Sequence, residues 1–187
     1  MKRLSLIAAS IFLASLFIQA QDSEDKFAGI RFGFHSAGLV IDGEKPDTTN
    51  SLNNFYIGFF REKKIAPLLY WGSGVEYFQN GTKYTNNSKR VLHTLSVPLN
   101  LKLKVGPIFG VAGAAANFKV SEKIVIGDTN TSPTDSNKSN WFDVPIYIGA
   151  GVKILFISVE ARYHWGLLDI QKGYYNRYFQ LGAALSF

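Results

Sequence analysis

The side chains best suited to acid–base or nucleophilic chemistry in this sequence of 187 residues are three histidines, because cysteine is absent. They are His35, His93 and His164. Each is expected near a strand end, and Ser36 directly follows the first of them, a pairing that can activate a hydroxyl nucleophile. The spacing, with Asp42 and Asp169 nearby, matches no hydrolase motif, and histidines scattered in this way are far more often simple polar lining than catalysts. We therefore expect no catalytic residues and no enzymatic activity.

Metal and cofactor chemistry is likewise not predicted. The absence of cysteine removes disulfides, thiolate ligands and a lipidated cysteine after a signal sequence. Asp128, Asn130 and Asp135 lie in one polar stretch, but they lack the glycine and the closing glutamate of a calcium loop. We expect no cofactor and no metal site.

Six charged residues lie within stretches that otherwise alternate between apolar and small or polar positions. They are Arg31, Glu76, Lys102, Asp143, Glu160 and Arg162. All six fall on the polar face of their stretch, and there are three charges of each sign. Enclosed charges are tolerated when they are paired. We predict one buried network in which Glu160 and Arg162, two residues apart, reach charges on other strands.

Eight stretches of alternating residues must position these charges. They span residues 27–36, 54–61, 68–79, 94–104, 108–118, 141–151, 156–166 and 178–187. A period of two indicates strands and not helices. The facing of the fifth stretch is ambiguous because it is rich in glycine and alanine, and we expect Phe109 and Val111 to point outward.

The connections between these stretches alternate between long and short, and one of the short turns is expected at the charged residues 62–64. That alternation is typical of barrels with short periplasmic turns and longer extracellular loops. A lipocalin-like barrel would instead enclose apolar residues, whereas the polar face here carries the six charges. We predict an all-β fold, an eight-stranded antiparallel transmembrane β-barrel of one domain, residues 21–187, in the bacterial outer membrane with periplasmic termini.

Residues 1–20 have the features of a signal peptide. Lys2 and Arg3 form a positive start, residues 4–17 are apolar, and Ala20 precedes the expected cleavage site at Gln21. Removal of the two cations lowers the formal net charge from +6 to +4. The remaining cations are spread along the chain, so nucleic acid is not an expected partner.

The last strand and its terminal aromatic residue are expected to be the signal that the barrel assembly machinery reads. The outward residues of this signal are Phe179, Leu181, Leu185 and Phe187. Outward aromatic residues also sort by height into two girdles, as membrane interfaces favour. The girdle near the long loops contains Phe34, Phe55, Tyr77, Phe142, Tyr163 and Trp165. The girdle near the short turns contains Phe59, Trp71, Phe109, Phe179 and Phe187.

Two prolines lie on lumen faces of the strands that flank residues 108–118. Pro98 and Pro145 each remove a ladder hydrogen bond that lipid cannot replace. A β-bulge or a lumen water at each proline is one explanation. The alternative is a weakened seam, where the glycine- and alanine-rich strand opens or receives a partner.

Two strand motifs in the sequence are LSVPLNLK at residues 95–102 and EARYHWGL at residues 160–167. They resemble motifs of PorT-like outer-membrane β-barrel proteins of the Bacteroidota, which are small barrels of the porin family. Residues 95–102, LSVPLNLK, resemble the family's "IP-leucine-leucine-lysine" strand, and residues 160–167, EARYHWGL, resemble its "E-x-R-Y-x-x-G-L" strand end. With the terminal Phe187, the resemblance covers essentially the whole mature chain. It implies location and fold more than a task, since one member is associated with a gliding-type secretion system and most have no assigned activity.

The sequence leaves three classes of function open. The first is a structural or interaction protein with a side-chain-filled lumen, which acts through extracellular loops or a secretion-system partner. The second is a passive pore for small solutes, and the third is a lipid-modifying outer-membrane enzyme. The expected partners are outer-membrane lipid and lipopolysaccharide, the barrel assembly machinery, and a secretion-system or extracellular protein. We expect a monomer.

Overall fold

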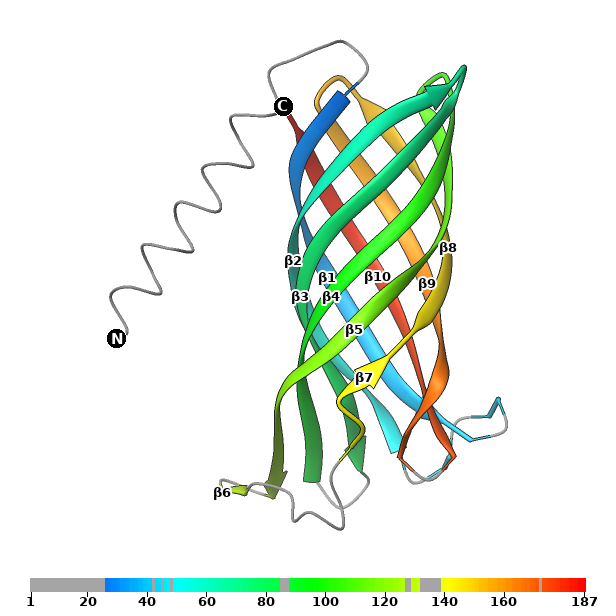
Figure 1. Ribbon diagram of the computed structural model, residues 1–187. Coiled ribbons are helices and arrows are strands. Elements are labelled where there is room, and N and C mark those ends of the chain that lie inside the picture. The colour runs from blue at the N-terminus through cyan, green and yellow to red at the C-terminus, as the bar shows by residue number, and fades with distance from the viewer. Residues whose placement is uncertain are drawn as a thin grey trace, which may run out of the picture.

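A closed ring of eight long antiparallel strands forms the protein (Figure 1). The computed structural model describes residues 26–41, 43–44, 46–47, 49–84, 88–126, 129–131, 139–171 and 173–187. The expected signal peptide, residues 1–20, lies outside them. In the described part of the chain, no helix is long and apolar enough to cross a membrane.

The strands follow one another around the ring in chain order. They are β1 Lys26–Val40, β2 Thr49–Ala66, β3 Leu69–Tyr84, β4 Ser88–Val105, β5 Ile108–Ile126, β6 Thr129–Thr131, β7 Phe142–Asp143, β8 Pro145–Ile154, β9 Ile157–Gln171 and β10 Tyr174–Ser186. The short β7 precedes β8 and pairs with β5, so β7 and β8 together act as one wall strand. The short β6 pairs only with the end of β5. Pairing of β1 with β10, from Gly29 with Ser186 to Val40 with Tyr175, closes the ring. The prediction of an eight-stranded barrel is confirmed.

The two ends of the barrel differ in how the strands are connected. At one end, here called the turn end, two-residue turns join β2 to β3, β4 to β5, and β8 to β9. The start of β1 and the carboxyl terminus lie at the same end, at the top of Figure 1. The other four connections lie at the opposite end, here called the loop end, and they differ in length: the β1–β2 and β5–β8 connections are long, whereas the β3–β4 connection has three residues and the β9–β10 connection only two. The strands extend further toward the loop end than the sequence predicted, so the expected long loops are shorter.

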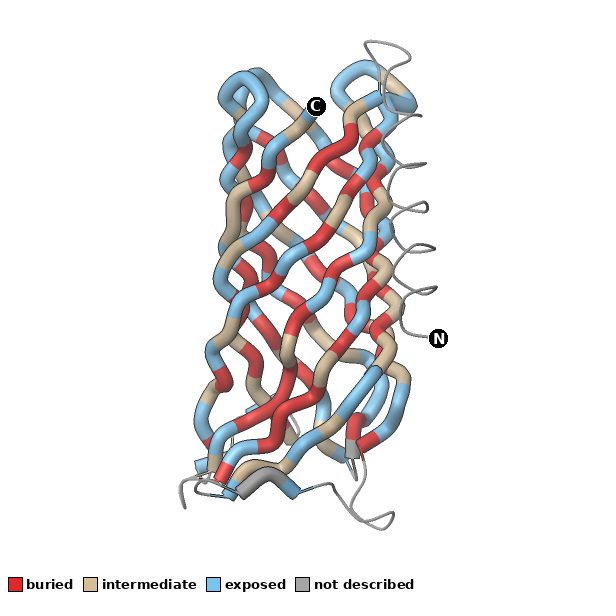
Figure 2. Tube along the Cα trace, turned by 90° about the vertical axis from the view of Figure 1, so that its left-hand side faces the viewer, coloured by how far each residue is buried: buried red, intermediate tan, exposed pale blue. Residues whose placement is uncertain are grey.

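Alternate residues face the outside and the inside of the ring, and Figure 2 shows exposed and buried residues alternating along the strands. The outside is apolar: Phe32, Ile57 and Leu99 are each between 44% and 53% exposed. The inside is polar, and among its buried residues are Arg31, Glu76, Asn100, Lys102, Glu160, Arg162 and Gln180. This distribution is the reverse of that in a water-soluble barrel and suits a wall that meets lipid.

The structure corrects the predicted facing of β5. Phe109 and Val111 are buried inside the barrel, and Phe109 is therefore not part of the outer aromatic girdle. The reason is the tight turn at Gly106 and Pro107, because it pairs Val105 with Ile108 and Lys104 with Phe109. Residues that are paired across two strands share a face. Since Lys104 faces the lumen, its partner does so too.

Candidate functional site

A cluster of seven charged residues fills the lumen on the turn-end side of its centre. This lumen charge cluster consists of Arg31, Glu62, Glu76, Lys102, Lys104, Glu160 and Arg162. It draws side chains from β1, β2, β3, β4 and β9, and most of them are more than 90% buried. Four positive charges face three negative ones, so the carboxylates each have cations on more than one side.

Glu76 and Glu160 connect the centre of the cluster. Arg31 Nη1 lies 3.1 Å from Glu76 Oε1 and 3.8 Å from Glu160 Oε1. Arg162 Nη1 lies 3.0 Å from the same oxygen of Glu76, and its Nε lies 3.0 Å from Glu160 Oε1. Lys102 Nζ is 3.3 Å from Glu160 Oε2. The side chains of four strands are therefore held together across the lumen.

Glu62 and Lys104 extend the cluster toward the turn end, and the sequence analysis did not include them. Glu62 accepts hydrogen bonds from Lys102 and, at 2.7 Å, from Lys104 Nζ. The prediction of a turn at residues 62–64 is wrong, because β2 continues to Ala66. Gly58, Phe60 and Glu62 are buried at alternate positions of β2. Continuing the alternation of this stretch by one more step would have predicted that Glu62 faces the lumen.

Asp143 lies apart from the lumen charge cluster. It sits in β7, nearer the loop end, where it pairs with Asn117 on β5 and lies close to Gly166. Within the described residues it forms no ion pair with the five other charges that were grouped with it. The structure thus brings together five of the six predicted residues, whereas Asp143 lines a small cavity with Asn80, Asn117 and Asn176.

A stack of aromatic rings occupies the lumen next to the charge cluster. Tyr178 lies at its centre, with ring centroids 4.1 Å from His164 and 4.9 Å from His35. His164 in turn stacks on Tyr147 at 4.6 Å, and His35 on Phe78 at 4.5 Å. The Arg162 guanidinium lies 5.7 Å from the centroid of the Tyr147 ring and so links the stack to the cluster.

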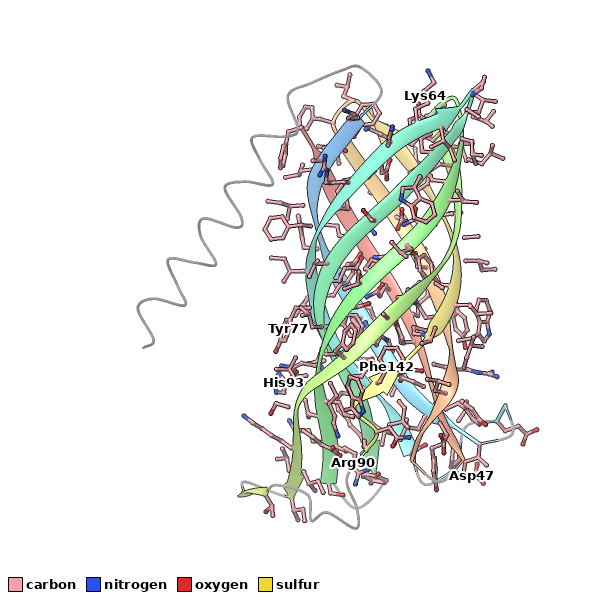
Figure 3. The ribbon with its side chains drawn as sticks, viewed as in Figure 1. Asp47, Lys64, Tyr77, Arg90, His93 and Phe142 are labelled. Carbon is pink, nitrogen blue, oxygen red and sulfur yellow. The ribbon has the colours of Figure 1, made fainter. Side chains whose placement is uncertain are left out.

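The three histidines are therefore not gathered at a rim. His35 and His164 are buried in the lumen, and His35 Nε2 lies 2.9 Å from Asn80 Oδ1. Ser36 faces the other way and donates a hydrogen bond to Asn53. His93 is on the outer face of the wall, where Figure 3 shows it near Tyr77. Its Nδ1 lies 2.5 Å from the Tyr77 hydroxyl. Ser36 and His35 therefore lie on opposite faces of β1. Each histidine is at least five residues from the loop-end limit of its strand, so the expected positions near strand ends are wrong.

The lumen is also filled at the loop end. Leu39, Leu92 and Ile170 form a buried apolar cluster against which Tyr174 packs. Beyond it, Glu122 lies 3.5 Å from Arg90 Nε and accepts a 2.9 Å hydrogen bond from Ser139 Oγ. Lys119 also pairs with Glu122. This second group of charges was not predicted, because its residues lie in stretches that we expected to be loops.

Glu122 lies on the loop-end side of a row of outward aromatic residues, the kind of row that marks a membrane interface. The outward aromatic row contains Tyr77 and Phe118, which face Leu95 from either side, and Glu122 follows this row toward the loop end. Burial opposes ionisation of Glu122, but Lys119 and Ser139 outweigh it and hold the pKa of this carboxyl below its ordinary value. The charged carboxylate fixes Ser139, the first described residue after the long connection that follows β6.

The two prolines lie at interruptions of the ladder. Both are buried, as predicted for lumen faces. Gly74 and Val75 of β3 form no ladder pairs with Pro98 and Val97 of β4. On the other side of β4, the ladder with β5 is continuous at these two residues. At Pro145 the interruption separates β7 from β8. The gap at Pro98 therefore faces β3 and not the glycine- and alanine-rich β5, and opening of a seam is still a prediction.

The terminal strand presents the four residues of the expected assembly signal to the outside. Phe179, Leu181, Leu185 and Phe187 are between 36% and 52% exposed. The backbone of Phe187 is paired with Ala28 in both directions, at 2.8 Å and 3.3 Å. The carboxyl terminus is thus part of the ring closure.

Comparison with solved structures places this barrel beside small outer-membrane barrels of similar size. The crystal structure of Ail, the attachment invasion locus protein of Yersinia pestis, in complex with the heparin analogue sucrose octasulfate, has a TM-score of 0.54 at 15% identity and covers 87% of this chain and 99% of Ail. The neisserial surface protein A, NspA, has a TM-score of 0.54 at 12% identity and covers 88% of this chain and 100% of NspA. At these identities the likeness shows the fold alone.

A search of curated proteins found no match. A family model does match, and it spans residues 19–172, which is most of the chain. The matched region includes β1 to β9 with their inward charges, so the family model covers most of the ring of strands. The chain belongs to the family of the outer membrane protein beta-barrel domain.

Proposed function

We propose that the protein is a barrel with a lumen closed by its own side chains, and that it acts as a structural or interaction protein. The observation that carries this proposal is the lumen charge cluster, with Glu76 and Glu160 held by arginines from opposite sides. An eight-stranded barrel has an interior just wide enough for side chains to fill. The aromatic stack and the apolar cluster of Leu39, Leu92 and Ile170 add two further layers.

The interaction takes place, in this proposal, through the loop-end surface or through a secretion-system partner. We infer that the loop end is extracellular and that both termini are periplasmic, which is the usual arrangement for an even number of strands. Lys83 and Lys89 are exposed there and paired directly across β3 and β4. The solved complex of Ail contains a sulfated heparin analogue, and an anionic saccharide would suit these two lysines.

The relationship to PorT-like proteins of the Bacteroidota is part of the same proposal. Its support is still the motif at residues 95–102 on β4 and the motif at residues 160–167 on β9. Glu160 and Arg162 of the second motif form an ion pair within the lumen charge cluster. In this proposal the motif supplies side chains that fill the lumen. The barrel assembly machinery and outer-membrane lipid are the partners of the protein during its insertion.

Single-channel recording tests the closed lumen. The folded barrel in a planar bilayer is expected to show no steady conductance of the size of an open aqueous pore. Removal of the central side chains, as in a combined Glu76→Ala, Glu160→Ala and Arg162→Ala variant, is expected to introduce measurable conductance if the variant folds. Steady conductance of the wild type would contradict the closed lumen and favour a passive pore for small solutes instead. Lipid A mass spectrometry with and without the protein tests the enzyme, and co-purification from native membranes tests the partner.

A further inference from the structure

The outer wall near the turn end has two neighbouring cavities on β1 to β4. The first has a volume of about 290 Å³ and is mainly apolar, with Phe59, Val75 and Val97 among its lining residues. The second has a volume of about 190 Å³, and its lining includes Lys26, Lys63 and Trp71. Arg61 and Ser73 line both cavities. An apolar hollow in the wall thus continues into a basic one.

Strand register orders these residues by height along the wall. Nearest the turn end, Lys63 is paired with Lys26 on one side and with Trp71 on the other. Two residues further along β2, Arg61 is paired with Ala28 and Ser73. Two residues further again, Phe59 is paired with Ile30 and Val75. The outer face therefore changes from cationic to apolar within two steps toward the middle of the wall.

The hollow exists because small residues stand between larger ones. Ala28 and Ser73 face outward beside Phe59, Arg61 and Val75, so neither fills the space at the wall. Gly74, Val75 and Val97 also line the apolar cavity. The cavity therefore lies at the place where Gly74 and Val75 form no ladder pairs with β4. A mainly apolar hollow on a lipid-facing wall suits an acyl chain.

The two facing lysines of the basic cavity favour an anion between them. Like charges directly opposite one another on paired strands are destabilising, and Lys26 and Lys63 are such a pair. No acidic side chain of the described residues forms an ion pair with either lysine. Glu62 lines the same cavity, but Lys102 and Lys104 hold its carboxylate in the lumen. Trp71 beside the lysines suits the headgroup level of a bilayer, where tryptophan is enriched.

We propose that these two cavities form a binding site for one anionic phospholipid of the leaflet that meets the turn end. The phosphate lies between Lys26 and Lys63, and one acyl chain lies in the apolar cavity beside Phe59 and Val75. The order of charge and apolar surface along the wall is that of a lipid with its headgroup toward the turn end. The site depends on the barrel spanning a membrane and is independent of a closed lumen or a loop-end partner.

The test is a titration of the full-length folded barrel in detergent with phosphatidylglycerol or phosphatidylethanolamine, followed by native mass spectrometry. The wild type is expected to bind one phosphatidylglycerol in preference to phosphatidylethanolamine. A Lys26→Gln, Lys63→Gln variant is expected to bind phosphatidylglycerol roughly 30-fold more weakly, since each lysine near an anionic headgroup contributes to binding. Glycerol phosphate, which has no acyl chain, is expected not to bind measurably.

The matched control is Lys83→Gln with Lys89→Gln, because these lysines are also directly opposite and exposed but lie at the loop end. It removes the same charge and is expected to change the affinity less than twofold. Ser73→Phe fills the space shared by the two cavities and is expected to abolish binding while the barrel still migrates as a folded, heat-modifiable species. Equal losses in the two lysine variants, or equal affinity of the wild type for both lipids, would overturn the site. Undiminished binding by folded Ser73→Phe would also overturn it.

Discussion

Arg162 Nε lies 3.0 Å from Glu160 Oε1, and the two side chains occupy neighbouring positions on the inner face of β9. The pair is not isolated, because Arg162 also reaches Glu76 on β3 and Glu160 also reaches Lys102 on β4. Each of the two residues therefore holds its own strand to a strand on the other side of the ring.

Removal of one member of this group is expected to be costly. Arg162→Ala or Glu160→Ala should lower the free energy of unfolding by about 3–5 kcal/mol, because each leaves buried opposite charges without a partner. Urea unfolding in detergent measures this loss. A double-mutant cycle of Arg162→Ala with Glu76→Ala should show a coupling of about 0.5–3 kcal/mol. Lys89→Ala, at an exposed outer position, is the control and should change stability by less than about 0.5 kcal/mol. Additive effects of Arg162→Ala and Glu76→Ala would contradict the cluster.

The glycines of the inner face are expected to make room for the cluster. A Cβ atom on Gly58 would lie 2.6 Å from Glu76 Cγ and 2.7 Å from the backbone oxygen of Val75. Gly58→Ala should therefore destabilise the barrel by about 1–3 kcal/mol, as overpacking does. Gly110 on β5 is the matched control, since a Cβ there would meet its nearest atom only at 4.0 Å. If both alanine variants unfold at the wild-type urea concentration, the inner face is less tightly packed than the structure indicates.

The loop-end network around Glu122 is expected to respond to acid. The pKa of Glu122 is lowered in the folded protein, so its contribution to stability is complete above the ordinary carboxyl pKa and disappears as the pH falls through the folded value. Hydrogen exchange at the Ser139 amide, which donates a 3.1 Å hydrogen bond to Glu122 Oε2, should accelerate over that range after correction for intrinsic rates. Glu122→Gln should remove the pH dependence. A corrected rate that is the same at neutral and acidic pH in the wild type would be the contrary result.

Deletion of Phe187 is expected to reduce the amount of folded barrel. The reason is that the terminal aromatic residue completes the outer face of β10 and that its backbone pairs with Ala28 at the ring closure. The measurement is the fraction of heat-modifiable protein in isolated outer membranes. Phe156→Ala removes another exposed aromatic side chain at the turn end and should leave this fraction unchanged. Equal folded yields with and without Phe187 would exclude its role in assembly.

The mature protein is expected to begin at Gln21. The positive start at Lys2 and Arg3, the apolar residues that follow and Ala20 are the basis of this prediction. Intact-mass analysis of protein extracted from the outer membrane distinguishes the cleaved form from one that retains Met1. A change of Ala20 to a large residue such as Phe should slow processing, and normal processing of that variant would argue for another cleavage site.

The number of strands, their period and the polar interior were predictable, because every long strand alternates between apolar and polar residues. The facing of β5 was predictable in principle, since the two-residue turn at Gly106 and Pro107 fixes Phe109 opposite Lys104. The register of distant strands was less accessible. Whether Arg31 meets Glu76 or Asp143 depends on how all the strands are staggered around the ring, and a single sequence does not specify that stagger.

The extent of the strands was also underestimated, for a physical reason. Beyond the membrane the outer face of β4 and β5 carries Lys89 and Lys123, so the apolar alternation stops although the ladder continues. The change to polar residues predicts the end of each strand, whereas the hydrogen bonds of the ladder continue beyond it. Arg90, Glu122 and Ser139 lie in that continuation, and they were missed for this reason.

The ionic filling of the lumen also has a consequence for the evolutionary history of the chain. Arg162 is shared by carboxylates of two strands, so a neutral replacement at any one of these positions leaves an uncompensated charge. Substitutions inside the barrel are therefore expected to become fixed in compensating pairs, with Glu76 and Arg162 exchanged or neutralised together. The lipid-facing positions, such as Ile57 and Leu99, accept one apolar residue for another independently. Related barrels should then share an outer wall of freely drifting residues around a lumen whose charges covary.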